Sequence, residues 1–387
     1  MTRMAKETMA QLPDPLVTRA ARFLRAGLMA LPAALLAGCF QDLKQSTVFP
    51  ESDSGRVIQD VYRMVTWIDT GIFILVVVLL AWAVWRYRES NSPAGAIPEQ
   101  VHGNPVLEVL WTVIPAVILI FIAVPTWTGI FRNATLPKGE GLKIEAIGHQ
   151  WWWEFKYKDA GLVTANELHV PVGKTVEIMT TSKDVVHSFW VPKLAGKMDA
   201  FPEKQNLIWF TPDKVGVYYG QCAEFCSTSH ANMRFRIMVD SEADYAAWME
   251  RTKKPQLAKS DDAKAGELLF AEKGCPTCHT INGKNQAAFD FAPNLTNLKD
   301  RTSIASALID NTPENLARWI KAPRDVKPGV LMCWPPQMDR TSAECGKFPV
   351  TDDEVNKLIA YLNSPSAGAT ADYYKAAQPA LAESPKK

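Results

Sequence analysis

Two long apolar runs, at residues 64–85 and 106–130, constrain the fold of this 387-residue chain more than any other feature. As a helix, the first run would reach about 33 Å at about 1.5 Å per residue, which is enough to cross a bilayer. It contains one charged residue, Asp69, near one end. A polar segment with Pro and Gly residues separates the runs, and several tryptophans lie in or beside them, as is typical of membrane interfaces. The sequence therefore predicts a two-helix transmembrane hairpin at residues 63–132.

The N-terminal segment is typical of a secretory signal. Arginines precede an apolar run, residues 26–37, that is too short to span a bilayer. The run ends in Leu-Ala-Gly-Cys, which resembles a bacterial lipobox, so we expect a lipoprotein-type signal peptide at residues 1–38 and lipidation of Cys39. The alternative is an ordinary signal with a chance cysteine. An extracytoplasmic tether at residues 39–62 and two crossings would then return residues 131–387 to the outer side.

Residues 140–245 follow a different pattern. Short alternating runs such as ELHVPV, KTVEIMTTS and NLIWFTP are separated by turn signals. Runs of this kind are typical of strands in an all-β sandwich or barrel. We therefore expect an extracytoplasmic all-β domain after the membrane hairpin.

A cluster of soft metal ligands lies near the end of this β region. Cys222, Cys226, His230 and Met233 fall within twelve residues, and His187 lies on an earlier, separate loop. Such ligands select copper, zinc or iron–sulfur over magnesium or calcium. The thioether and the spacing, which differs from the paired CxxC of zinc ribbons, favour copper. A remote His combined with a Cys/His/Met loop predicts a cupredoxin copper site.

The second cysteine makes the site suited to two copper ions instead of one. Two thiolates can bridge a pair of coppers, with further ligands from His187, His230, Met233 and the backbone carbonyl of Glu224. Sharing one electron between two metals keeps the change in geometry small, which favours fast electron transfer. The alternative is a disulfide between Cys222 and Cys226 in an oxidising compartment.

Residues 275–279 read Cys-Pro-Thr-Cys-His, the attachment motif of c-type haem. In this motif the thiols of Cys275 and Cys278 add covalently to the haem, and His279 becomes an axial iron ligand. The motif alone occurs by chance, and a CxxC can also form a redox disulfide. The preceding helical pattern, the extracytoplasmic location and the downstream sequence favour the haem interpretation.

The sixth iron ligand has two candidates, Met332 and Met338. The sequence KPGVLM, ending at Met332, resembles the segment of class I cytochromes c that supplies this ligand, and the resemblance favours Met332. Cys333 stands where that family usually has proline, and an insertion follows. A disulfide between Cys333 and Cys345 would close the insertion in an oxidising compartment.

The C-terminal region is therefore expected to hold an all-α cytochrome c domain at residues 263–365. Residues 351–362 start with a capped acidic turn and show helical apolar spacing. A polar linker at residues 246–262 would precede the domain. A mobile tail rich in Ala, Pro and Ser, residues 366–387, would follow it.

Taken together, the motifs GHQWWW, DVVHSFWVP and GQCAEFCSTSHANM resemble subunit II of the haem–copper cytochrome c oxidases. The resemblance covers residues 62–240 and implies a dinuclear CuA copper centre with the ligands His187, Cys222, Glu224, Cys226, His230 and Met233. It implies that the Glu224 side chain reaches a magnesium site shared with subunit I. It also implies that electrons enter through Trp151 and that Glu108 lies at the mouth of a proton channel. From position alone, Glu108 would be an interfacial carboxylate and Trp151 a core or interface aromatic.

We therefore expect a subunit II fused to a cytochrome c domain in a bacterial plasma membrane. Electrons would pass from an external donor, a cytochrome c or similar protein, to haem c, to CuA and on to subunit I of a proton-pumping oxidase that also contains subunit III. The oxygen site would not lie on this chain. A net charge of +1 gives no indication of a nucleic-acid partner. The alternatives are the corresponding subunit of a CuA-containing nitric oxide reductase and a copper-delivery or assembly protein.

Overall fold

The computed structural model describes residues 42–88, 102–282, 292–333, 339, 342 and 344–367. The expected signal peptide, Cys39, Met338 and most of the expected C-terminal tail lie outside these residues. The chain divides into a unit of residues 1–43 and a unit of residues 44–387, and all elements below belong to the second unit.

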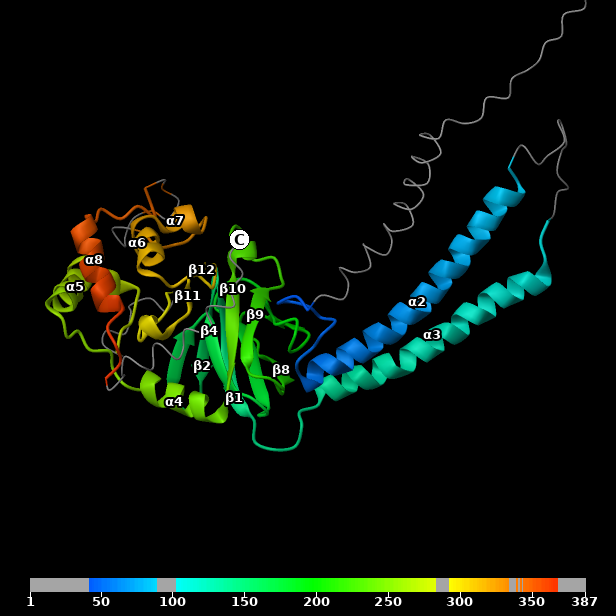
Figure 1. The fold of residues 1–387 in the computed structure, drawn as a ribbon, viewed down its shortest axis with the longest axis horizontal. Coiled ribbons are helices and arrows are strands. Elements are labelled where there is room, and N and C mark those ends of the chain that lie inside the picture. Colours follow the sequence, from blue (N-terminus) through cyan, green and yellow to red (C-terminus); the bar gives the residue numbers. More distant parts are fainter. Residues whose placement is uncertain are drawn as a thin grey trace, which may run out of the picture. The chain divides into compact units, whose positions relative to one another are not determined.

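Two long helices form the expected hairpin, α2 (Asp53–Arg86) and α3 (Pro105–Ala134), and they run side by side in Figure 1. Both are long and apolar enough to cross a membrane, and their most apolar windows are not buried against protein. Gly129 of α3 permits close approach, because a Cβ there would lie 3.3 Å from Val57 of α2. Helix α2 begins inside the expected tether, since Ser52 accepts a hydrogen bond from the Gly55 N–H and caps the helix there.

The β domain consists of two five-stranded sheets, ordered β3-β2-β1-β5-β8 and β4-β10-β9-β6-β7. The strands are β1 (Leu142–His149), β2 (Trp152–Tyr157), β3 (Leu162–Ala165), β4 (Glu167–Pro171), β5 (Val176–Ser182), β6 (His187–Trp190), β7 (Lys197–Ala200), β8 (Asn206–Phe210), β9 (Gly216–Cys222) and β10 (Arg234–Asp240). Alternate residues face inward on β5, where Val176 and Ile178 are fully buried. The aromatic rings of Trp153, Phe189 and Phe235 contact one another between the sheets.

Strand pairing brings the two parts of the expected copper site together. Strand β6 begins at His187 and pairs with β9, which ends at Cys222, with Phe189 opposite Cys222. Two glycines make room for the neighbouring rings. A Cβ on Gly148 would lie 2.6 Å from the His187 ring, and one on Gly220 would lie 2.3 Å from the Phe235 ring. A short 3₁₀ helix, η3 (His230–Asn232), follows β9 and precedes β10.

The C-terminal domain is mainly helical. Its elements are α5 (Asp261–Glu272), η4 (Cys275–Thr277), η5 (Leu298–Asp300), β11 (Ser303–Ile304), β12 (Ile309–Asp310), α6 (Pro313–Lys321), α7 (Pro323–Val326) and α8 (Asp352–Leu362). Helices α5 and α8 pack closely, because Gly266 lies where a Cβ would collide with the Lys357 carbonyl. A capping box between Thr351 and Glu354 starts α8.

The segment expected as a polar linker is ordered by specific contacts at both ends. Helix α4 (Glu242–Thr252) covers its first part, and Trp248 stacks on His169 of the β domain with ring centroids 4.3 Å apart. Further along, Gln256 is 3% exposed and donates to the Tyr361 carbonyl while accepting from the Asn297 N–H. Composition indicated a polar segment, but the buried Trp and Gln attach it to both domains.

Candidate copper centre and haem cavity

The expected copper ligands lie together at one end of the β sandwich. The Sγ atoms of Cys222 and Cys226 are 3.7 Å apart. The Nδ1 atom of His187 lies 3.8 Å from the Cys222 sulfur, and Nδ1 of His230 lies 3.6 Å from the Cys226 sulfur. The Met233 sulfur lies 3.8 Å from the Cys226 sulfur. Each thiol therefore has one imidazole beside it, which suits a pair of metal ions bridged by two sulfurs.

The two cysteines of this loop are free thiols. Both are buried, and their sulfurs are farther apart than the roughly 2.05 Å of a disulfide. Among the described residues, the ligand atoms of His187, Cys222 and Cys226 form a compact group that could hold a metal ion, all within 4.8 Å of one another. The disulfide alternative is therefore not the arrangement of this loop.

Hydrogen bonds prepare this loop for a cation. The hydrogen bond between the two thiols lowers the pKa of Cys222, with burial opposing and His187 adding to the effect. The same interaction and burial raise the pKa of Cys226. Burial disfavours protonated His187, but hydrogen bonds to Asp184 and Cys222 raise its pKa overall. Metal binding requires deprotonated thiols, so a bound cation would displace protons from this loop.

Asp184 fixes the orientation of His187. Its Oδ1 atom lies 2.8 Å from Nε2 of His187, and its Oδ2 atom accepts from the Gln150 N–H at 2.7 Å. This leaves Nδ1 facing the sulfurs, as expected for a ligand whose other ring nitrogen is held by a carboxylate.

The backbone carbonyl and the side chain of Glu224 have different partners. Its carbonyl lies 3.2 Å from the Cys222 sulfur, where it suits a weak copper ligand. Its carboxylate accepts from the N–H of Phe225, a residue whose side chain is 76% exposed. The exposed part of this loop is therefore open to a partner.

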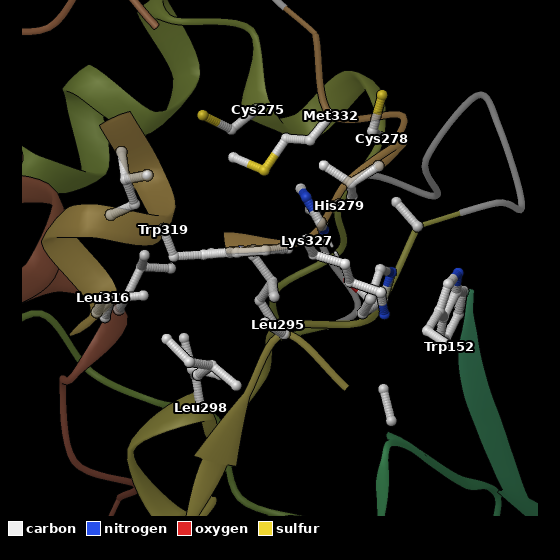
Figure 2. Close-up of a pocket in the computed structure, with 18 of the residues that line it drawn as sticks. Trp152, Cys275, Cys278, His279, Leu295, Leu298, Leu316, Trp319, Lys327 and Met332 are labelled. Atoms are coloured by element: carbon white, nitrogen blue, oxygen red, sulfur yellow. Dashed lines mark hydrogen bonds between the residues drawn. The ribbon is translucent and has the colours of Figure 1, made fainter. Parts of the chain in front are cut away.

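The C-terminal domain encloses a mainly apolar cavity at the expected haem site, and Figure 2 shows some of its walls. Cys275, Cys278 and His279 line it together with Met332 and Trp319. Further apolar walls come from Leu295, Leu298, Leu316, Ile320, Val350 and Leu358. Neither cysteine of the motif forms a disulfide. A flat, apolar macrocycle with two covalent attachment points fits these walls.

His279 is held in the tautomer that an iron ligand needs. Its Nδ1 atom donates to the Pro293 carbonyl at 2.8 Å, which leaves Nε2 as the basic nitrogen. Burial lowers the pKa of His279, so the ring is neutral at physiological pH. Met332 lines the same cavity, and Cys333 beside it forms a disulfide with Cys345.

The haem cavity and the copper loop meet at Trp151. This residue is 7% exposed and lines the cavity, and its indole N–H donates to the Cys226 carbonyl at 2.7 Å. The Lys327 ammonium and the Ser306 hydroxyl of the C-terminal domain both donate to the Trp151 carbonyl. Gly329 lies against the indole, where a Cβ would be 3.1 Å from the ring.

A second group of buried contacts joins the same two domains. Glu167 is 2% exposed and accepts from the Thr302 N–H at 2.9 Å and from the hydroxyls of Thr302 and Ser303. Arg236 donates to the Thr302 hydroxyl and pairs with Asp310. None of these contacts was expected from the sequence. In the sequence, Lys-Pro-Gly at residues 327–329 indicates only the iron ligand that follows it, Met332.

The remaining expected residues have separate places. Glu108 lies exposed in the first turn of α3, on a different element from the copper ligands. His149 stacks on Trp152, with ring centroids 4.2 Å apart. His169 pairs with Asp240 at 2.7 Å. These two histidines support the fold of the β domain.

Comparisons with known families agree with this arrangement. The chain matches the family models for the transmembrane domain of cytochrome c oxidase subunit II at residues 46–128, the periplasmic domain of that subunit at residues 161–241, and cytochrome c at residues 263–366.

Several relatives match most of the chain. Cytochrome c oxidase subunit 2 of Alkalihalophilus pseudofirmus is 34% identical over 353 residues, covering 89% of this chain and 97% of the relative. The protein of the same name from Bacillus subtilis is 34% identical, covering 87% of this chain and 95% of the relative. The solved periplasmic domain of subunit II of cytochrome oxidase of Bradyrhizobium japonicum is 35% identical, with a TM-score of 0.30, covering 31% of this chain and 97% of that one.

These matches confirm the expected multidomain fold, with two apolar helices, a cupredoxin-like β domain and a cytochrome c domain. They imply copper in the β domain, haem in the helical domain and anchorage in a membrane. The chain belongs to the cytochrome c oxidase subunit II family, as part of an oxidase complex, and carries a cytochrome c domain.

Proposed function

We propose that this chain receives electrons for a proton-pumping cytochrome c oxidase and relays them from an external donor, through covalent haem c and a dinuclear CuA centre, to a haem–copper subunit I. The observation that carries the proposal is the junction at Trp151. Its ring lines the haem cavity, and its indole N–H is bonded to the carbonyl of Cys226 in the copper loop. Two redox sites that share one tryptophan are suited to a relay.

The haem would be held by thioether bonds to Cys275 and Cys278, with Nε2 of His279 and the sulfur of Met332 as axial ligands. When bound, the haem and the copper pair supply one-electron carriers. The chain itself supplies a mainly apolar cavity for the haem and holds the tautomer of His279 through the Pro293 carbonyl. Met332 is favoured because it lines this cavity together with His279.

Copper would be held by the two thiolates, with terminal and weak ligands from His187, His230, Met233 and the Glu224 carbonyl. The near-symmetric distances around Cys222 and Cys226 support two metal ions over one. In the same proposal, the Glu224 carboxylate reaches a Mg²⁺ site shared with subunit I. Glu108 would lie at the mouth of a proton channel.

The proposed location follows from the membrane helices. Cys39 would be lipidated after removal of the signal, and both redox domains would lie on the outer side of a bacterial plasma membrane. Subunit III and a cytochrome c or similar donor would complete the assembly. A donor domain held on the same chain acts at an effective concentration of roughly millimolar, so the second transfer needs no diffusional encounter.

Turnover of the purified complex tests this function. With a reduced external cytochrome c as donor, we expect oxygen consumption in which the haem of this chain is reduced before the copper pair. Reduction of nitric oxide without oxygen consumption would assign the chain to a nitric oxide reductase instead. Copper that exchanges freely with a chelator, with no turnover of either gas, would indicate a copper-delivery protein.

A further inference from the structure

Lys327 is a buried lysine at the junction of the two redox domains. Its side chain belongs to the C-terminal domain and is 2% exposed. The ammonium donates to the Trp151 carbonyl, 176 residues away in sequence, and to the Ser306 hydroxyl at 2.7 Å. Ser306 in turn donates to the same Trp151 carbonyl at 2.8 Å. One backbone oxygen of the β domain thus accepts two hydrogen bonds from the other domain.

The two residues after Lys327 lie against the copper loop. The Pro328 carbonyl accepts a hydrogen bond from the Ser229 hydroxyl. At Gly329, where φ is +77°, a Cβ would lie 3.0 Å from Thr228 and 3.1 Å from the Trp151 ring, so this segment has no room to shift inward. Residues 327–329 therefore rest on the loop that carries Cys226 and on the tryptophan bonded to it.

This contact is the part of the junction beside the copper loop. Burial lowers the pKa of Lys327 to about 7, which reflects the cost of placing an ammonium in an apolar site. Away from the copper loop, Glu167 and Arg236 already join the domains through buried hydrogen bonds. Loss of Lys327 would therefore leave the domains docked while loosening the segment nearest to the copper ligands.

We infer that Lys327 is a positioning residue that holds residues 327–329 of the haem domain against Trp151 and thereby sets the rate of electron transfer from haem to the copper pair. The inference rests on the proposed function. The step moves one electron: the reduced haem domain loses it and the oxidised copper pair gains it, and no covalent bond or proton changes place. Trp151 is also closed to a soluble donor, so the external donor must reduce the haem.

The test uses the complete oxidase complex with Lys327→Met, which keeps an unbranched side chain of similar length but removes the donor. Lys347→Met is the matched control, because that lysine lies in the same domain with its side chain 70% exposed. The haem is reduced rapidly by a light-activated reductant, and the absorbance of the copper pair is followed.

We expect Lys327→Met to slow reduction of the copper pair several-fold, because electron transfer slows as the haem domain is held less closely against Trp151. Haem reduction by the external donor, the haem spectrum and the copper resonance should match the unaltered complex, and Lys347→Met should change nothing. A purely structural role would alter the spectra together with the rate.

An unchanged transfer rate in Lys327→Met with both centres intact would overturn the inference. Absence of covalently bound haem or of the copper pair from this chain in the unaltered complex would instead refute the proposed function. If Lys327→Met fails to assemble, Ser306→Ala decides, because it removes one of the two donors to the Trp151 carbonyl. A transfer rate about threefold lower supports the inference, since the loss of one neutral hydrogen bond is a modest effect, and an unchanged rate refutes it.

Discussion

Replacement of Glu167 by glutamine tests the docking of the two redox domains at a single carboxylate. Glu167 accepts from the Thr302 N–H at 2.9 Å, from the Thr302 hydroxyl at 2.6 Å and from the Ser303 hydroxyl. Glutamine keeps the shape but removes the charge and one acceptor oxygen. Hydrogen bonds to a charged group contribute about 1.5–3 kcal/mol each, against about 0.5–1.5 kcal/mol for neutral ones. We therefore expect Glu167→Gln to weaken this contact by about 1.5–3 kcal/mol.

Hydrogen exchange at the Thr302 amide measures this change directly, since that amide is protected by a bond across the junction. A weakening of about 1.5–3 kcal/mol corresponds to exchange faster by roughly 10-fold to 150-fold. Glu203→Gln is the control, because Glu203 is an exposed glutamate of the same β domain. Equal exchange of the Thr302 amide in Glu167→Gln and the unaltered chain would refute this docking of the domains.

Three further predictions concern single side chains. Tyr157→Phe should lower the free energy of unfolding of the β domain by about 1–3 kcal/mol in a denaturant titration, because it leaves the half-buried His169 N–H without the hydroxyl that it bonds at 2.8 Å. Equal unfolding midpoints in the variant and the unaltered chain would contradict this. Met332→Ala should abolish the methionine–iron charge-transfer band while Met338→Ala leaves it, and the reverse result would reassign the ligand. For Glu354, hydrogen bonds from the backbone N–H of the helix cap and from a lysine lower the pKa to about 2. The Glu354 carboxylate therefore stabilises the haem domain above its usual pKa of 4.5, and this stabilisation is lost as the pH falls toward 2. Over that pH range, the melting temperature of the haem domain should fall more in the unaltered chain than in Glu354→Gln.

Local motifs made most of the copper site predictable from the sequence. Cys222, Cys226, His230 and Met233 lie on one short loop, so their spacing alone indicates a shared metal. The remote ligand His187 was found because ligand chemistry required a further imidazole. Helix α8 was predicted from its cap at Thr351 for the same reason, since caps are local signals.

The junction between the redox domains was not predictable in this way. The bond between Lys327 and the Trp151 carbonyl joins residues 176 positions apart, and no pattern in either segment encodes the other. Gln256 lies in a segment whose composition indicates a polar linker, yet its amide is buried and hydrogen-bonded to Asn297 and Tyr361. Polar residues that become buried only through tertiary contacts leave no periodic signal in the sequence.

Metal analysis combined with electron paramagnetic resonance of the purified complex tests the relay most directly. Beyond the copper of subunit I, we expect two coppers for each covalently attached haem iron, with hyperfine splitting from two equivalent copper nuclei. The reason is that the Sγ atoms of Cys222 and Cys226 lie 3.7 Å apart, and each has one imidazole beside it. One copper per chain, or hyperfine splitting from a single nucleus, would contradict a dinuclear centre and the relay built on it.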